Sequence, residues 1–170
     1  MQTFTGRAFP LLNPTPADID SEDIAHALSL ICRYGGHVSR FYSVAEHCVL
    51  MSYAVPAEHA LWALLHDATE AYLGDVISPL KHHLPEYRVV ENRLMHAVIK
   101  RFSLPDAMPD RVAGADMRIL HDERAALLGP TPRPWMPSLE ALPPLGVTIH
   151  GWAPDEAEMQ YLSRLIELTS

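Results

Sequence analysis

Three polar residues interrupt one of the most apolar stretches of the chain. In the run ALWALLHDATEAYLGD, His66 and Asp67 are flanked by leucine and alanine, and Glu70 follows four residues after His66. An unpaired ionised carboxylate buried in such surroundings is strongly destabilising, so a compensating partner is expected. A divalent cation is such a partner, because imidazole and carboxylate ligands together suit Mn, Fe, Co or Zn. The His66-Asp67 pair therefore predicts half of a metal site, with Glu70 on the same face of a helix.

Two other polar residues in apolar surroundings are candidates to complete the coordination shell. They are His47, in VAEHCVLM, and Asp116, in RVAGADMRIL. Two imidazoles and two carboxylates would leave positions for a water and a substrate oxygen, as a catalytic rather than a structural site requires. Asp122 is a competing fourth ligand, which we rank below Asp116 because polar neighbours such as Glu123 indicate a solvated face.

The elements that must position these residues are predicted to be helices. Apolar spacing, a serine N-cap at Ser43 and a first-turn proline at Pro56 are typical helix signals. The strongest predicted helix begins at Pro56, is rich in Ala and Leu and meets no helix breaker before Gly74. The other predicted helices span residues 22–34, 44–54, 86–103, 109–128 and 154–168.

The two non-helical regions are rich in proline. Residues 1–20 are expected to form an extended N-terminal arm, and residues 130–153 a wrapped proline-rich loop that serves as a lid or packing strap. No repeat or shift in composition divides the chain. At 170 residues it is predicted to be a single domain, residues 1–170, with an all-α fold: a compact bundle of about six helices.

Composition limits the partners and the compartment. A formal charge of −8 disfavours binding to a nucleic-acid polymer, because that affinity depends on many Lys and Arg contacts to phosphates. No apolar run approaches the roughly 20 residues needed to span a bilayer, and the N-terminus lacks the features of a secretory signal. Cys32 and Cys48 are too few for a disulfide framework and form no CxxC pair. A cytoplasmic protein with no membrane partner is expected.

The order H…HD…D, together with its surroundings, resembles the HD-domain metal phosphohydrolase superfamily. The resemblance extends from about residue 20 to 128 and is carried by CRYGGH, YSVAEHC and ALLHDATEAYLGDVISPLK. It is most specific in the pattern HD-x-x-E-x-x-x-GD-x-x-x-P-x-K, preceded by EH and followed by AD. The stretch is similar to small HD proteins that include bacterial 5′-deoxynucleotidases and phage dATP triphosphohydrolases. The resemblance implies a compact HD-domain fold.

The resemblance also implies roles for individual residues. Glu70 would be a general acid or base beside one divalent transition metal, and Asp75 would orient the attacking water or the sugar. Arg33 and Tyr34 would meet the phosphate and the base or sugar, although Tyr34 replaces the more usual tryptophan. Lys81 would contact distal phosphates. The implied metal ligands are His47, His66, Asp67 and Asp116.

Several functional alternatives remain open from the sequence. The expected substrate is a small-molecule (deoxy)nucleoside phosphate, cleaved either by a dATP-type dNTP triphosphohydrolase or by a 5′-deoxynucleotidase. A triphosphate would need additional positive charge, for which His37, Arg40 and Lys81 are available, and could bring an additional Mg ion. The alternative class is a catalytically silent HD scaffold that binds a nucleotide or a partner. A cyclic-dinucleotide phosphodiesterase is disfavoured by the lack of a GYP-like motif. Relatives imply a homo-oligomer, dimer or hexamer, located in the host cytoplasm if the protein is phage-encoded.

Overall fold

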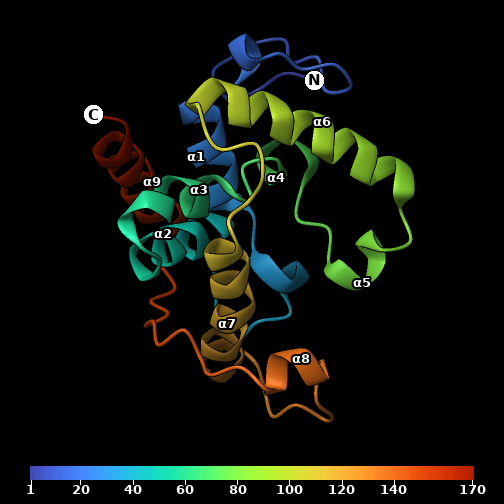
Figure 1. Cartoon of the computed structure of the whole chain (residues 1–170), viewed down its shortest axis with the longest axis vertical. Coiled ribbons are helices and arrows are strands. Elements are labelled where there is room, and N and C mark those ends of the chain that lie inside the picture. The colour runs from blue at the N-terminus through green and yellow to red at the C-terminus, as the bar shows by residue number, and fades with distance from the viewer.

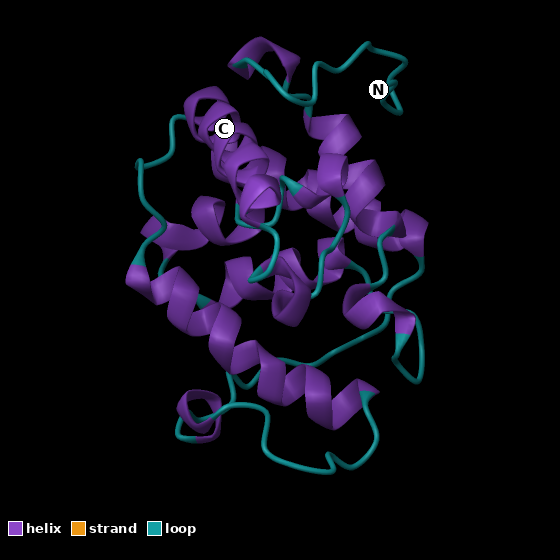
Figure 2. Cartoon of the chain, turned by 90° about the vertical axis from the view of Figure 1, so that its right-hand side faces the viewer, coloured by secondary structure: helices purple, strands orange, loops and turns teal.

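A computed structural model describes residues 1–170, and its regular structure is entirely helical. Figure 2 shows only helices and loops. The β-type backbone pairing is limited to two isolated bridges, Gln2 to Ala8 and Cys32 to Ser43. The α-helices are α1 (Ser21–Leu30), α2 (Val44–Ala54), α3 (Ala60–Leu65), α4 (Glu70–Leu73), α5 (Ser78–Lys81), α6 (Pro85–Phe102), α7 (Asp110–Leu127), α8 (Pro137–Glu140) and α9 (Pro154–Thr169). Short 3-10 helices are η1 (Pro16–Asp18), η2 (Arg33–Gly36) and η3 (Ala57–His59).

The prediction of an all-α fold is confirmed, and several helix ends follow from local signals. Helix α2 begins after Ser43, whose side-chain oxygen accepts a hydrogen bond from the Glu46 backbone N–H at 3.0 Å. Helices α6 and α9 begin at Pro85 and Pro154. Proline suits the first position of a helix, because an N–H there would have no intrahelical partner. These helices, together with α7, agree with the predicted spans to within one residue at each end.

The predicted helix over residues 22–34 is too long. Helix α1 ends at Leu30, because the following backbone pairs with the start of α2 instead of continuing the helix. The Arg33 N–H donates to the Tyr42 carbonyl at 2.9 Å, and the Val44 N–H donates to the Ile31 carbonyl at 3.1 Å. This pairing fixes Arg33 beside the N-terminal end of α2.

The helix predicted to run unbroken from Pro56 to Gly74 is also wrong. The chain instead forms η3, α3 and α4, with residues 66–69 in a turn. In this turn the Ala68 N–H bonds the Leu65 carbonyl and the Glu70 N–H bonds the Asp67 carbonyl, both three residues apart. The His66-Asp67 pair therefore lies at a break between two helices, where tighter turns are commonly found.

Helix α2 lies at the centre of the core. It packs against α1, α3 and α9, as Figure 1 shows, and eight of its eleven residues are buried. Because so little of its surface faces water, a polar side chain on α2 needs a partner inside the protein. The main apolar cluster around it includes Ile24, Leu28, Val49, Leu64 and Leu65.

Helix α7 closes the core on another side. Its Val112, Ala115 and Ile119 pack with Met51 of α2 and Trp62 of α3 in a second apolar cluster. Burial of these side chains stabilises the docking of α7 by roughly 1.5–3 kcal/mol for each large residue. Asp116 follows Ala115 on this helix, so the same packing holds its carboxylate near α2.

The proline-rich segment, residues 130–153, wraps around α7 and is interrupted by α8 (Figure 1). The end of this segment is held by Glu46, a fully buried residue of α2. The Glu46 carboxylate accepts hydrogen bonds from the backbone N–H groups of His150, Gly151 and Trp152 at 2.7, 2.9 and 2.7 Å. A bend at Gly151, with φ +72°, allows these N–H groups to converge.

The N-terminal arm, residues 1–20, lies at the opposite end of the molecule from α8 (Figure 1). Phe9 anchors it in the core and stacks on Tyr72 at 4.1 Å between ring centroids. None of the helices has both the length and the apolar character needed to cross a bilayer.

Candidate metal centre

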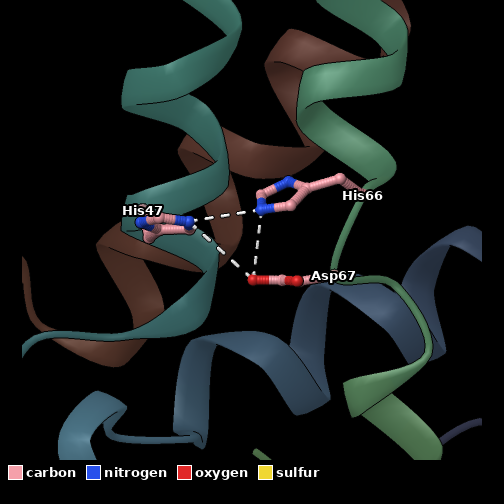
Figure 3. A group of neighbouring side chains, drawn as sticks. All are labelled: His47, His66 and Asp67. Atoms are coloured by element: carbon pink, nitrogen blue, oxygen red, sulfur yellow. Dashed lines mark hydrogen bonds and ion pairs between the residues drawn. The ribbon is translucent and has the colours of Figure 1, made fainter. Parts of the chain in front are cut away.

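Four side chains from three parts of the fold meet at the edge of the core, where both histidines are buried and the Asp67 and Asp116 side chains are partly exposed. His47 comes from α2, Asp116 from α7, and His66 and Asp67 from the turn after α3. The Nε2 atoms of His47 and His66 are 3.3 Å apart, and the Asp67 Oδ2 lies 3.2 Å from His66 Nε2 and 3.8 Å from His47 Nε2 (Figure 3). The Asp116 Oδ1 lies 3.4 Å from His47 Nε2 and 3.9 Å from His66 Nε2. All four predicted ligands are therefore brought together.

The second ring nitrogen of each histidine has a fixed hydrogen-bond partner. His47 Nδ1 donates to the Glu123 carboxylate at 2.6 Å, and His66 Nδ1 donates to the Ala63 carbonyl at 2.8 Å. In the neutral form each ring carries one proton, so both protons are used at Nδ1 and each Nε2 presents a lone pair. When both rings are neutral, two lone pairs face each other at 3.3 Å without a hydrogen bond, and either a proton on one Nε2 or a cation between the rings would remove this repulsion.

The electrostatics of the cluster favour positive charge. Burial disfavours the charged form of His66, but the Asp67 carboxylate and Cys48 together outweigh it and raise the pKa of this imidazole well above its usual value. Burial likewise opposes ionisation of Asp67, but His66, His47 and Arg33 together outweigh it and lower the pKa of this carboxyl. The cluster could therefore hold a cation, since His47, His66 and Asp67 each offer one ligand atom and these atoms lie within 4.8 Å of one another.

Glu123 is the residue that organises the surroundings of His47. It is fully buried and accepts hydrogen bonds from the hydroxyl groups of Tyr34 and Tyr42, the latter at 2.9 Å. The Arg33 Nε lies 3.4 Å from the same carboxylate that bonds His47. Burial raises the pKa of Glu123, but Arg33 and His47 outweigh this and lower it to about 2. An ionised Glu123 fixes the tautomer and the orientation of His47.

The sequence analysis placed Glu123 on a solvated face, and the structure shows the opposite. Glu123 lies seven residues after Asp116 on α7, which is two helical turns along the same face. That spacing was the signal that could have identified it. Asp122 points elsewhere, because its carboxylate accepts hydrogen bonds from the Leu145 and Gly146 N–H groups at 2.8 and 3.1 Å. The choice of Asp116 over Asp122 agrees with this geometry.

Glu70 is close to the cluster but is not one of its four predicted ligands. Its Oε2 atom is buried without a hydrogen-bond partner, and its Oε1 lies 3.9 Å from Lys81 Nζ. Burial, with the nearby Asp67 and Asp75 carboxylates, raises the pKa of Glu70 to about 9. The side chain is therefore protonated at neutral pH and can donate a proton. Burial also raises the pKa of Asp75.

A cavity of about 640 Å³, a size typical of small-molecule sites, approaches the cluster at Arg33, and none of the four cluster residues is among its lining residues. Arg33 connects the two, because it lines the cavity and its Nη1 lies 3.4 Å from the Asp67 Oδ2. Tyr34 and Asp75 also line this cavity. The outer wall comes from the proline-rich segment, through Thr131, Pro132, Arg133, Pro134, Trp135 and Met136.

A second cavity of about 490 Å³ reaches His66 and Asp67 from the side of α6. Its charged lining is acidic apart from histidine, since Glu91 and Asp106 join Asp67 and no Lys or Arg is present. The larger cavity contains Arg33 and Arg133 against one carboxylate, Asp75. An anionic ligand is therefore better matched to the larger cavity.

Three residues predicted to bind substrate lie outside the larger cavity. His37 is exposed at the end of η2. The Arg40 guanidinium donates to the Ile149 carbonyl at 2.9 Å, which directs it toward the proline-rich segment. Lys81 donates to Glu91 at 2.8 Å.

The fold and this cluster define an all-helical protein with a candidate metal centre at the edge of its core. No protein-family model matches the sequence. The chain is 39% identical over 170 residues to the uncharacterized protein YfdR of Escherichia coli K12, covering 99% of this chain and 95% of YfdR. It is also 44% identical over 115 residues to an uncharacterized protein of Rhodobacter capsulatus, covering 62% of this chain and 59% of that protein. The chain belongs to the same family as YfdR.

Proposed function

We propose that the chain is a divalent-metal-dependent phosphohydrolase of the HD superfamily that acts on (deoxy)nucleoside phosphates. The observation that carries this proposal is the pair of imidazole Nε2 atoms that face each other at 3.3 Å, with both Nδ1 protons already used. The Asp67 and Asp116 carboxylates complete a set of two nitrogen and two oxygen donors. Such a set suits Mn, Co, Zn or Fe and leaves room for further ligands.

The chain's own residues can perform the remaining tasks of phosphoester hydrolysis. What a divalent ion supplies when bound is Lewis acidity, which polarises a phosphoryl oxygen and acidifies water. Arg33 faces the cavity beside Asp67 and can offset the charge of a phosphate. Glu70, whose pKa is raised by burial and by the nearby carboxylates in the metal-free protein, would donate a proton to the leaving oxygen, and such a step contributes about 10²–10⁴-fold to the rate.

The distribution of cations favours a monophosphate over a triphosphate. A triphosphate needs positive charge for its outer phosphoryl groups, and the cavity offers only Arg33 and Arg133, with His82. Arg40 and Lys81 are engaged with Ile149 and Glu91 instead. The 5′-deoxynucleotidase alternative therefore fits the cavity better than the dNTP triphosphohydrolase.

The proposal is tested by phosphate and triphosphate release from a panel of dNMPs and dNTPs, with protein loaded with Mn, Co or Zn. Orthophosphate from dNMPs is the expected product, whereas triphosphate from dNTPs would identify the other activity. Asp67→Ala should abolish both metal content and turnover. Asp155→Ala, which removes an exposed carboxylate on α9, is the matched control and should change neither.

Two outcomes would contradict the proposal. Full metal content in the Asp67→Ala protein would refute the ligand assignment. Metal-loaded protein that hydrolyses no nucleotide would favour the alternative, a silent scaffold that binds a nucleotide or a partner.

A further inference from the structure

Trp135 of the proline-rich segment forms an aromatic corner with Tyr34 at the cavity wall. Their ring centroids are 6.0 Å apart and the ring planes are inclined at 52°. Both residues line the cavity of about 640 Å³ that approaches the metal cluster at Arg33. The two rings are too close and too tilted to enclose a third ring between them. They offer instead a face and an edge against which one planar group can pack.

The position of Trp135 is fixed from α7 and α8 even though the residue is 37% exposed. The Arg124 guanidinium lies 5.3 Å from the centre of the indole ring. Arg124 is itself held by two bonds to the Glu140 carboxylate, at 2.6 and 3.2 Å. The Trp135 backbone N–H donates to the same carboxylate at 3.4 Å. An exposed indole held in this way is preorganised for a ligand.

The remaining walls of the cavity specify the chemistry of that ligand. Ile77, Leu120 and Met136 make much of the lining apolar. Arg133 also lines the cavity and makes no ion pair within the chain. At the other end Arg33 lies 3.4 Å from Asp67. The cavity therefore combines an aromatic corner with positive charge that leads toward the cluster, which matches a planar aromatic group carrying a phosphate.

We propose that Trp135 is the specificity-determining residue that binds the nucleobase of the substrate. The base packs in the corner formed by Trp135 and Tyr34, and the 5′-phosphate reaches Arg33 beside the cluster. This assignment rests on the proposed function, because it places the substrate's phosphate at the metal centre. It gives the proline-rich segment a role in substrate selection in addition to its packing on α7.

The experiment compares substrates that carry a base with one that lacks it. Metal-loaded protein is assayed with the four dNMPs and with 2-deoxyribose 5-phosphate, and kcat and KM are measured for each. The wild type should prefer a dNMP. Trp135→Ala should lower kcat/KM for that dNMP roughly 5- to 100-fold, mainly through KM, as expected for loss of one stacking side chain. Its kcat/KM for 2-deoxyribose 5-phosphate should stay within about twofold of the wild type.

Two control variants accompany Trp135→Ala. Trp135→Phe keeps an aromatic face and should retain most of the preference for a dNMP. Phe4→Ala removes another exposed aromatic residue, 59% accessible on the N-terminal arm, and should behave as the wild type.

The assignment fails independently of the proposed function. If the wild type hydrolyses both substrates with equal kcat/KM, the base-binding role of Trp135 is overturned and the hydrolase stands. An equal loss on both substrates in Trp135→Ala would also overturn it. If neither substrate is hydrolysed, dNMP binding is followed by tryptophan fluorescence. Quenching that disappears in Trp135→Phe would then support the base site while the hydrolase fails, and the lack of any quenching would overturn both.

Discussion

Replacement of Glu123 by glutamine tests whether a residue that touches no metal controls the metal centre. The substitution keeps the size of the side chain but removes its charge. A glutamine has one acceptor oxygen, whereas the Glu123 carboxylate accepts from two tyrosine hydroxyls and from His47 Nδ1. The buried Arg33 guanidinium also loses one of its two carboxylate partners and keeps only Asp67.

The structure sets the size of the expected effect. The pKa of Glu123 is lowered from 4.5 to about 2, which corresponds to about 3 kcal/mol of interaction with the ionised form. Because the pKa is depressed in the folded protein, this stability is present above pH 4.5 and is lost as the pH falls through 2. The free energy of unfolding of Glu123→Gln should therefore be about 3 kcal/mol lower than that of the wild type at pH 7. The affinity for Mn or Co should fall roughly 10- to 100-fold, because His47 is no longer held.

The assay pairs urea unfolding of metal-free protein with calorimetric titration of Mn or Co into the folded protein. Glu46→Gln is the matched control. Glu46 is equally buried, neighbours His47 in sequence and accepts three hydrogen bonds, but all of these come from backbone N–H groups of residues 150–152. It should lose stability and keep its metal affinity within a few-fold. Metal affinity of Glu123→Gln within twofold of the wild type would refute the reasoning.

Three other substitutions have defined outcomes. Because the pKa of Glu70 is raised to about 9 from 4.5, this group should lower the free energy of unfolding by about 1.4 kcal/mol for each pH unit of increase between these values. Glu70→Gln should remove this contribution in urea unfolding of metal-free protein, and parallel curves for the two proteins would contradict it. Gly151→Ala should lower the free energy of unfolding by about 1–3 kcal/mol in the same assay at pH 7. The reason is that φ is +72° and the added Cβ would lie 3.2 Å from the Phe41 carbonyl oxygen. An unchanged unfolding midpoint would argue against this strain. Asp122→Asn should weaken the hydrogen bonds that hold the proline-rich segment at Leu145 and Gly146, and so speed chymotrypsin cleavage after Trp135. The metal content should not change, and a loss of metal would indicate that Asp122 is a ligand.

Much of the helical organisation could be predicted because its signals are local. The Ser43 cap and the first-turn prolines at 85 and 154 act within one helical turn, and these ends were predicted to within one residue. The errors occur where distant backbone competes. Helix α1 stops at Leu30 because the next residues pair with the start of α2. The long Ala- and Leu-rich stretch divides at residues 66–69, although it contains no residue that breaks helices.

Sequence by itself also identified the four residues that the fold brings together in the candidate metal centre. A polar residue inside an apolar helical stretch must find a partner wherever the chain folds, so the type of residue and its surroundings are enough to select His47, His66, Asp67 and Asp116. The same reasoning carried the choice of Asp116 over Asp122. It cannot select a residue whose neighbours in sequence are polar, and for that reason Glu123 was missed.

Only the tertiary structure decided how the surroundings of the centre are arranged. It placed Glu123 behind His47, turned Arg40 and Lys81 away from the larger cavity, and brought Trp135 from the proline-rich segment against Tyr34. These positions depend on the packing of segments up to about a hundred residues apart, which no local pattern encodes. Residue type thus predicted which side chains form the candidate metal centre, and packing determined which cavity lies beside it.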